Sequence, residues 1–492
     1  MAILSIRSGP LVRQISFDAP QDLSTLLQEA DAAIAHPCGG RGVCGKCAVV
    51  LSGDVSSPSA AELQLGLRLS CQAVITGDAE VILPAVLPME QIDGGSALDL
   101  SPSSPMQGRF GAAVDIGTTT IALLLYDLSS GKCLGSASML NPQTTIAADV
   151  IGRIDASMKG QTDRLLRMAE DAVNTLLVSA CGKAGIDSAD VTALTVTGNT
   201  TMLYLLCGRN PEALSHAPFA ADHLFGESAA YLGRDVYLPH CLHAFVGADT
   251  CCALLASGML ERDETSLLCD VGTNGEIALW HNGVLYIAST AAGPAFEGAG
   301  ISCGCASIPG AIDKVSVHDG KLVCRTIGKK TAVGICGSGL VDAVAALLIT
   351  DALDETGFLE DDPVLLKDEA SLTQGDIRAV QLAKAAIHAG ILSLLETAGC
   401  SLDDVGTMYL AGGFGSHLNL SSASQIGLFP AELAQRVRVI GNAALDGAAM
   451  LLMDIRRRDE LSQIQKQAQH VRLDGNPFFA DKYINAMLFG DE

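Results

Sequence analysis

Four cysteines near the start of the chain have the residue type and the spacing of a metal centre. Cys38, Cys44 and Cys47 lie on one short stretch, PCGGRGVCGKC, and Cys71 follows after 23 intervening residues. The other twelve of the 16 cysteines are spread over the remaining sequence. Because four cysteine thiolates hold a [2Fe–2S] cluster, the pattern predicts such a cluster. The glycines between the cysteines allow backbone N–H groups to approach its sulfides.

Two other interpretations of these cysteines stay open. A structural zinc site usually has two Cys-x2-Cys pairs, and here only Cys44 and Cys47 form one. Four cysteines that only pack in a core are the second alternative. The five-residue gap between the first two cysteines resembles the loops of adrenodoxin-like ferredoxins and of ferredoxin modules fused to reductases. We therefore expect a ferredoxin-like [2Fe–2S] domain over residues 1–90.

Two similar turns later in the chain have residues that can bind phosphate. The stretches DIGTTT (115–120) and DVGTNG (270–275) both place Asp-x-Gly-Thr after an apolar run. A Gly-Thr turn offers N–H groups and hydroxyls to phosphate, and an aspartate at a strand end can hold Mg²⁺ through water. The stretch LAGGFGS (410–416) allows the close backbone approach that a flat nucleoside needs. The set predicts a site for ATP and Mg²⁺, although each turn alone is also typical of an ordinary strand connection.

The expected roles at this second site divide into three groups. Asp115 and Asp270 are expected to organise Mg²⁺ and the attacking water. The residues expected to grip phosphate are Gly117, Thr118, Thr119, Gly272, Thr273 and Asn274. The residues expected to line the nucleoside site are Gly412, Gly413 and Phe414.

The elements that position the cysteines look β-rich. ILSI and RQISF alternate as paired strands do, and Asp22 to Ala33 has helical apolar spacing. The stretches CAVVLSGDV and AVITGDAEVIL predict strands that are split by Gly-Asp turns. Residues 91–107 are rich in Gly, Ser and Pro without apolar periodicity, so they predict a linker.

From residue 108 onwards, apolar strand runs alternate with helical stretches, which predicts an α/β body with a mostly parallel or mixed sheet. The expected helices are Thr162–Ala184, Leu340–Ala352 and Asp376–Ala398. The two Asp-x-Gly-Thr hairpins lie 155 residues apart. This internal similarity predicts two related halves, 108–245 and 246–492.

Composition excludes some classes of partner. The chain has 492 residues, enough for about three domains. Its 31 basic and 55 acidic residues give a net charge of −24, which disfavours nucleic acid and anionic membranes. The start of the chain is not typical of a signal peptide, and we find no run of 18 uncharged apolar residues. We therefore expect a cytoplasmic protein.

The ordered set of turns resembles the actin, heat-shock chaperone and sugar kinase fold, in which two RNase H-like halves bind ATP. VTGNTTMLYLL and GICGSGLVDAV stand where that fold has its two connecting segments. Together with the cysteine motif, the chain resembles the reductive activators of corrinoid proteins. The resemblance rests on CGGRGVCGKC, DIGTTT, TGNTTMLYLLCG, CDVGTNGEIAL, AAGPAFEGAGISCG, GICGSGLVD, YLAGGFGSHLN and IGLFP…VIGNAALDGA.

This resemblance implies an ATP-dependent transfer of one electron from the [2Fe–2S] cluster to an inactive Co(II) corrinoid, which restores Co(I) for methyl transfer. It implies a corrinoid protein as a transient partner and an external electron donor for the cluster, and it leaves a homodimer open. Within AAGPAFEGAGISCG, Ser302 is the candidate for approaching the corrinoid.

Three rival functions remain at this stage. The first is an ATP-driven electron donor to another low-potential enzyme, as in the activators of 2-hydroxyacyl-CoA dehydratases. The second is a small-molecule kinase of the same fold, which leaves the cysteine motif without a role. The third is a ferredoxin carrier whose ATPase fold only docks.

Overall fold

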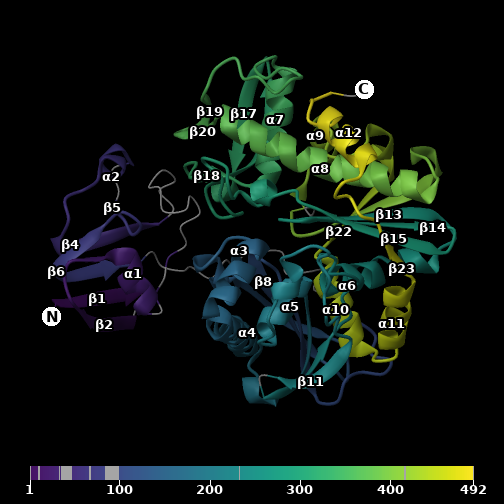
Figure 1. The fold of residues 1–492 in the computed structure, drawn as a ribbon, viewed down its shortest axis with the longest axis horizontal. Coiled ribbons are helices and arrows are strands. Elements are labelled where there is room, and N and C mark those ends of the chain that lie inside the picture. Colours follow the sequence, from purple (N-terminus) through teal and green to yellow (C-terminus); the bar gives the residue numbers. More distant parts are fainter. Residues whose placement is uncertain are drawn as a thin grey trace. The chain divides into compact units, whose positions relative to one another are not determined.

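The computed structural model describes residues 2–8, 11–30, 32, 34, 47–65, 68–83, 99–231, 233–414 and 417–490. Cys38, Cys44 and the linker residues 91–98 lie outside these ranges. The chain divides into two compact units (Figure 1). The first comprises residues 1–90 with the short segment 142–148, and the second comprises 91–141 and 149–492.

The first unit is a small sheet with one helix packed on it. The strand order is β2-β1-β6-β4-β5, and β3 pairs with β6. One face of α1 (Leu23–Glu29) buries three leucines against Leu4 and Ile6 of β1. The predicted strands and the helix are confirmed, but the helix ends at Glu29. The other elements are β1 Ala2–Ser8, β2 Leu11–Phe17, β3 Gln21–Asp22, β4 Ala48–Val55, α2 Ala60–Leu65, β5 Arg68–Leu69 and β6 Val74–Ile82.

The predicted Gly-Asp turns are wrong, because both glycines lie inside continuous strands. Gly53 adopts φ +99° at a register shift of β4 against β6. A Cβ at Gly53 would lie 2.4 Å from the carbonyl oxygen of Asp78, and one at Gly77 would lie 2.5 Å from Oδ2 of Asp54. The glycines therefore allow two strands to pass closely at a β-bulge, which a sequence pattern does not distinguish from a turn.

The second unit contains two six-stranded sheets of the same design. Their orders are β11-β12-β10-β7-β8-β9 and β22-β21-β13-β14-β15-β23. The strands are β7 Phe110–Ile116, β8 Thr120–Asp127, β9 Cys133–Leu140, β10 Val191–Gly198, β11 Glu227–Tyr231, β12 Arg234–Leu238, β13 Thr265–Val271, β14 Gly275–His281, β15 Val284–Thr290, β21 Val405–Ala411, β22 Val437–Gly441 and β23 Ala468–His470.

The internal similarity seen in the sequence is a repeat of topology. In the first sheet, β7 pairs antiparallel with β8 and parallel with β10. In the second, β13 pairs antiparallel with β14 and parallel with β21. Each Asp-x-Gly-Thr turn therefore joins a central strand, β7 or β13, to the antiparallel strand that follows it. The two turns occupy equivalent places in the two sheets.

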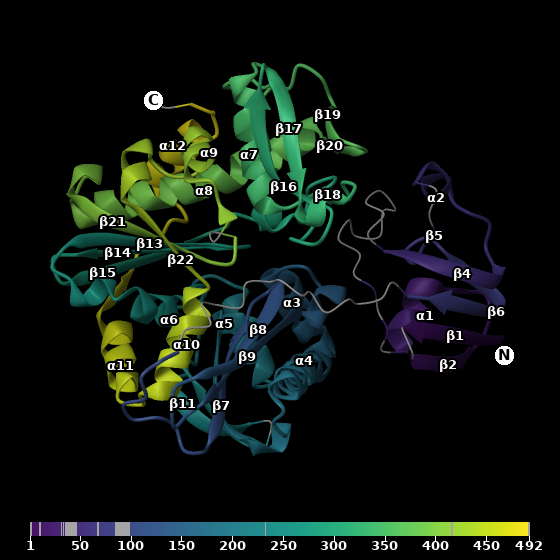
Figure 2. The ribbon, with the colours of Figure 1, turned by 180° about the vertical axis from the view of Figure 1, so that it is seen from behind.

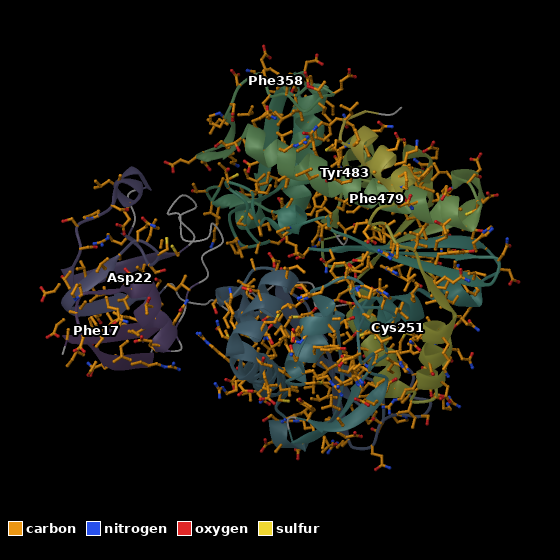
Figure 3. All side chains as sticks on the ribbon, viewed as in Figure 1. Phe17, Asp22, Cys251, Phe358, Phe479 and Tyr483 are labelled. Carbon is orange, nitrogen blue, oxygen red and sulfur yellow. The ribbon has the colours of Figure 1, made fainter. Side chains whose placement is uncertain are left out.

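Two central helices separate the sheets (Figure 2). α6 (Ala248–Ser257) and α10 (Ala443–Met453) pack on each other, and one buried cluster joins them to both sheets. Cys251, labelled in Figure 3, is fully buried in this layer beside Cys252, so both cysteines pack in the core. α4 (Thr162–Ala184) covers β8 and β9, while α8 (Gln374–Ala398) covers β14 and β15.

α8 is long and apolar enough to cross a bilayer by length and composition. Since 72% of its most apolar window is buried inside the fold, it is a core helix of the second unit. It confirms the predicted helix at Asp376–Ala398, as α4 does for Thr162–Ala184 and as α7, three residues earlier than predicted, does for Leu340–Ala352. The remaining elements are α3 Val150–Ala156, α5 Thr200–Leu206, β16 Ala311–His318, β17 Lys321–Thr326, β18 Gly334–Ile335, α7 Gly337–Ile349, β19 Val364–Lys367, β20 Ala370–Leu372, α9 Leu420–Gln425, α11 Arg457–Gln467 and α12 Pro477–Asn485.

The contact between the two central helices makes a test of the fold. A Cβ at Gly447 of α10 would lie 2.0 Å from the carbonyl oxygen of Cys252 in α6. Gly447→Ala should therefore destabilise the second unit by about 2–4 kcal/mol, because the helices must separate. Urea unfolding followed by the fluorescence of Trp280, the single tryptophan, reports on this unit.

Gly182→Ala is the matched control. Gly182 lies in α4, and a Cβ added there would meet open space, with no neighbouring side chain within 4 Å. The same change there should stabilise the protein by about 0.5–1 kcal/mol, since alanine has the higher helix propensity. A Gly447→Ala protein as stable as the wild type would contradict the close packing of α6 and α10.

Candidate functional site

Two of the four predicted cluster cysteines are described, and their sulfurs lie together. The Sγ atoms of Cys47 and Cys71 are 3.3 Å apart, and the two cysteines are not joined by a disulfide. Cys47 immediately precedes β4 and is 1% exposed, whereas Cys71 is partly exposed in the turn after β5. Two cysteine sulfurs that meet from different elements are what a four-cysteine metal centre requires. The described residues therefore fit a bound cluster.

A buried glutamate holds the turn that carries Cys71. Glu62 is 1% exposed, and its carboxylate accepts hydrogen bonds from the amides of Ser59 and Leu69 at 2.7 and 2.8 Å and from Nε of Arg68 at 3.0 Å. Burial acts to raise its pKa, but these hydrogen bonds outweigh burial and lower the pKa. Glu62 is therefore ionised at neutral pH and ties Ser59 to Arg68 and Leu69, next to the cysteine.

The two predicted phosphate turns meet at a single carboxylate. The hydroxyl of Thr273 donates to Oε2 of Glu297 at 3.0 Å, and the hydroxyl of Thr119 donates to the same oxygen. Thr119 belongs to the turn after β7, and Thr273 to the turn after β13. The fold therefore brings together two turns that are about one domain length apart in sequence.

Three partly buried aspartates lie at these turns. Loss of water raises the pKa of Asp115 to about 7, with further increases from the charges of Asp249 and Asp270. The pKa of Asp270 is also raised to about 7, by burial and by the charges of Asp249 and Glu297. Burial raises the pKa of Asp249 to about 6. Carboxylates that repel one another in this way bind a cation or a proton readily.

The nearby Glu276 is 7% exposed, and burial raises its pKa as well. Among the described residues, no group of three His, Cys, Asp or Glu side chains has the geometry to hold a metal directly. Coordination of Mg²⁺ through water does not need such a group, because Mg²⁺ usually keeps several of its water ligands in proteins.

Two asparagines orient the groups around these carboxylates. Nδ2 of Asn442 donates to Oδ2 of Asp115 at 3.1 Å, while its Oδ1 accepts from the amide of Leu445 and caps α10. Asn199 caps α5 in the same way and donates to the hydroxyl of Thr118 at 3.0 Å. The N-termini of α10 and α5 therefore start beside the first turn, where their amide dipoles favour anions.

A fully buried arginine donates a hydrogen bond to the backbone of the first turn. Arg153 of α3 is 0% exposed and donates through Nη2 to the carbonyl oxygen of Thr118. Burial lowers its pKa to about 10, and the charges of Asp149 and Glu297 counteract part of that shift. Arg153 thus stays charged at neutral pH and holds the turn in place.

The predicted nucleoside loop lies against the second aspartate. Gly412 adopts φ +94°, and a Cβ there would lie 2.6 Å from Oδ1 of Asp270. Gly413 is exposed with open space around it. The ring of Phe414 stacks on Phe296, with centroids 5.1 Å apart and an interplanar angle of 19°. The loop therefore approaches Asp270 as closely as only glycine permits.

Ser302 has local partners. Its amide donates to Oδ1 of Asp376 at 2.7 Å, and its hydroxyl donates to the same oxygen at 3.1 Å. Asp376 also forms a capping box with Thr373 at the start of α8. Ser302 is exposed, and its hydrogen bonds tie it to the start of α8. It does not belong to either of the two predicted phosphate turns.

Sequence reasoning missed six residues at these sites: Glu62, Arg153, Asn199, Asp249, Glu297 and Asn442. Asp249 lies in the first turn of the apolar helix α6, directly after Gly247-Ala248. An acidic residue before an apolar run is the sequence signal that could have identified it. Asn442 had the signal of an N-cap before an apolar run. Nothing in the local sequence marks Glu297, which becomes informative only when both turns are folded around it.

Known families match almost the whole chain. Residues 11–76 match the family described as "2Fe-2S iron-sulfur cluster binding domain". Residues 110–262 match the "RACo middle region", and residues 264–492 match the "C-terminal domain of RACo the ASKHA domain". The predicted combination of a ferredoxin-like domain with the ATPase fold of sugar kinases, heat-shock chaperones and actin is confirmed.

Individual proteins give the same result. A corrinoid activation enzyme, RamQ, from Eubacterium limosum is 37% identical over 443 residues, which cover 81% of this chain and 74% of that protein. The [Co(II) methylated amine-specific corrinoid protein] reductase of Methanosarcina barkeri is 26% identical and covers 76% of both chains. The solved structure of a reductive activator for corrinoid, iron-sulfur protein has a TM-score of 0.73 at 25% identity and covers 99% of this chain and 98% of that one.

The raised pKa of Asp115 predicts a pH dependence. Because the folded state holds the proton with a pKa of about 7 instead of 3.8, the group costs stability progressively as the pH rises from about 4 to 7. Asp115→Asn should therefore stabilise the nucleotide-free second unit by about 1–3 kcal/mol at pH 8, and by less at pH 5. Urea unfolding followed by Trp280 fluorescence measures both values.

Asp361→Asn supplies the matched control, since Asp361 is exposed. This variant should show the same stability as the wild type at both pH values. If Asp115→Asn gives no larger gain at pH 8 than at pH 5, the pKa of Asp115 is not raised by its burial and by the neighbouring carboxylates.

Proposed function

Because the chain belongs to the family of reductive activators of corrinoid proteins, we propose that it uses ATP to reduce an inactive Co(II) corrinoid protein to Co(I). One electron passes from the [2Fe–2S] cluster of the chain to the cobalt, which becomes ready for methyl transfer again. The observation that carries the proposal is the meeting of the two predicted phosphate turns beside three aspartates, in a chain where the sulfurs of Cys47 and Cys71 also lie together.

The cysteine site provides the electron. We assign Cys38, Cys44, Cys47 and Cys71 as cluster ligands, and a bound [2Fe–2S] cluster takes up and releases one electron at a time. Cys47 and Cys71 support this assignment through their 3.3 Å sulfur separation. Glu62 keeps the Cys71 turn in place through its hydrogen bonds to residues 59–69.

The two turns provide the ATP site. We assign Asp115 and Asp270 to Mg²⁺ through water, with Asp249 adding negative charge beside them. A bound cation lowers the pKa values of these carboxyl groups and so removes their mutual repulsion. The residues assigned to phosphate are Gly117, Thr118, Thr119, Gly272, Thr273 and Asn274, and those assigned to the nucleoside are Gly412, Gly413 and Phe414.

The energetics explain why ATP is required. [2Fe–2S] centres of the plant ferredoxin type have potentials of about −400 mV, and the resemblance implies a lower potential for the Co(II)/Co(I) couple. Each ~59 mV for one electron corresponds to about 1.4 kcal/mol. A gap of a few hundred millivolts therefore amounts to several kcal/mol. ATP supplies this free energy by changing a conformational equilibrium, since it does not take part in the electron transfer.

The remaining assignments concern partners. The corrinoid protein binds transiently, and a separate electron donor reduces the cluster. We place the reaction in the cytoplasm. Ser302 is an exposed residue of the stretch AAGPAFEGAGISCG, and we propose that it approaches the corrinoid.

The direct test mixes the reduced protein, a Co(II) corrinoid protein and Mg-ATP, and follows the cobalt absorbance. Formation of Co(I) should require ATP. Asp270→Asn should lower the rate at least about 100-fold, because it removes a charge that organises the metal and the attacking water. A lack of ATP-dependent Co(I) formation with every corrinoid partner tried would falsify the proposal and leave the rival electron-donor and kinase functions.

The ligand assignment has a separate test. Cys71→Ser should abolish or strongly alter the visible absorption of the cluster, because a hydroxyl is a poorer ligand for iron than a thiolate. Cys400→Ser, which changes a partly exposed cysteine outside the motif, should leave the spectrum unchanged. An unaltered cluster spectrum in Cys71→Ser would remove this residue from the ligand set.

A further inference from the structure

One short segment, residues 293–305, contacts both phosphate turns and the nucleoside loop, and we name it the coupling segment. It starts on the second turn, where the amide of Gly293 donates to the carbonyl oxygen of Thr273 at 2.9 Å. Four residues later, Glu297 accepts the hydroxyl hydrogen bonds of Thr119 and Thr273 on one oxygen. The segment therefore connects the first turn to the second.

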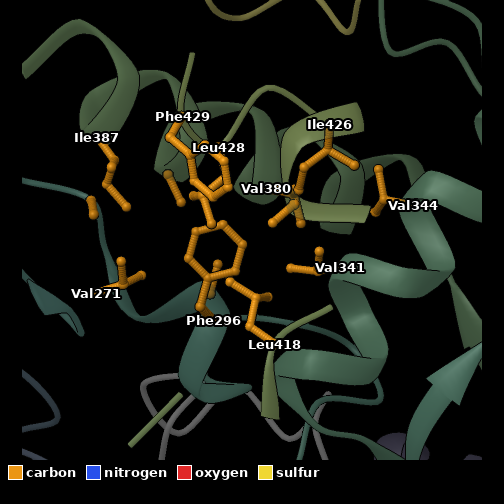
Figure 4. Close-up of a cluster of buried hydrophobic side chains, with 14 of the residues drawn as sticks. Val271, Phe296, Val341, Val344, Val380, Ile387, Leu418, Ile426, Leu428 and Phe429 are labelled. Carbon is orange, nitrogen blue, oxygen red and sulfur yellow. The ribbon is translucent and has the colours of Figure 1, made fainter. Parts of the chain in front are cut away.

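The residue before Glu297 connects the segment to the nucleoside loop. Phe296 is 2% exposed and stacks on Phe414 at 5.1 Å. Figure 4 shows Phe296 within a buried cluster with Leu418, Phe429 and Val271, the residue after Asp270. A movement of Glu297 therefore also disturbs an aromatic contact in the core of the second sheet.

The C-terminal end of the coupling segment is held by hydrogen bonds to β18 and to the start of α8. Cys303 and Cys305 exchange backbone hydrogen bonds with Ile335 of β18 at 2.8 and 2.9 Å. Ser302 is held by Asp376 at the start of α8, through its amide and its hydroxyl. Residue 300, just before these anchors, and Ser302 itself are exposed. The segment thus runs from the phosphate turns to an exposed rim at the end of a long core helix.

Glu297 occupies the hydroxyl groups that phosphate needs. Thr119 and Thr273 are assigned to the phosphates, and each hydroxyl has one hydrogen to donate. A carboxylate on those donors competes with phosphate for them, and its negative charge repels the phosphate oxygens. Nucleotide phosphates and Glu297 therefore exclude each other from this position.

We propose that Glu297 is a latch, which bridges the two phosphate turns in the nucleotide-free protein and is displaced when ATP phosphates take over its threonine partners. Its displacement releases the inner end of the coupling segment and transmits nucleotide binding to the exposed rim at Ser302. The inference rests on the proposed function, because it concerns how the same ATP site reaches the partner. Glu297 acts here as a positioning residue.

The first test is nucleotide affinity, measured by calorimetry with the full chain. In Glu297→Gln, the competing charge is gone, so ATP should bind about tenfold more tightly, equivalent to about 1.4 kcal/mol. Adenosine has no phosphate and should bind the variant and the wild type equally. Glu360→Gln makes the same charge change at an exposed position and should leave both affinities unchanged.

The second test follows amide hydrogen exchange in residues 298–303, without and with a non-hydrolysable ATP analogue. In the wild type, the analogue should speed exchange there, because the latch has opened. In Glu297→Ala, exchange should already be fast, and the response to the analogue should be lost. This readout separates a latch from a residue that only stabilises the fold.

ATP affinity that is unchanged or weaker in both Glu297 variants overturns the latch, as does a wild-type chain that binds no ATP. An analogue response that is unchanged in Glu297→Ala also overturns it. Tighter ATP binding together with a lost exchange response supports the latch even where no Co(I) is formed, so a failure of the proposed function is seen separately.

Discussion

Three aspartates lie together between two sheets, and their shared burial raises the pKa of each, which is the constraint on which the candidate ATP site depends. Asp115 and Asp270 end equivalent strands of a repeated sheet, and Asp249 begins a helix of the shared central layer. Burial raises the pKa values of Asp115 and Asp270. The charges of Asp249 and Asp270 raise that of Asp115 further, and those of Asp249 and Glu297 raise that of Asp270 further, so the nucleotide-free site is short of positive charge. Closely packed helices, which need Gly447 at their contact, keep the strand ends together despite this cost. A site of this kind favours a cation with its nucleotide, because binding relieves the repulsion.

Much of this arrangement could be predicted from local patterns. The Asp-x-Gly-Thr hairpins, the helix at Thr162–Ala184 and the approach of Cys71 to Cys47 each follow from residue types at fixed spacing. Such signals are contained within one element or one motif. Gly53 shows their limit, because a glycine in a bulge and a glycine in a turn have the same sequence pattern but differ in what the neighbouring strand does.

The residues that escaped prediction depend on tertiary structure. Glu297 has no motif, and its role arises only because two turns from different sheets converge on it. Arg153 looks like an ordinary helix residue until α3 packs behind the first turn. Glu62 likewise gains its partners only when residues 59–69 fold around it. In each case the main partners of the polar group are backbone or hydroxyl groups, which carry no sequence signature.

An uphill electron transfer needs ATP binding to change something that the partner can sense. Tightening two turns around a phosphate changes nothing outside the site unless a connected element has two arrangements. The proposed latch would meet this requirement, because Glu297 at the inner end of the coupling segment holds the threonine hydroxyls that we assign to phosphate, and the outer end is fixed to β18 and α8. Since Thr119 and Thr273 cannot serve carboxylate and phosphate at once, the segment has distinct empty and occupied states. Under this proposal, the free energy of phosphate binding becomes available at the exposed rim at Ser302, the surface that we assign to the corrinoid protein.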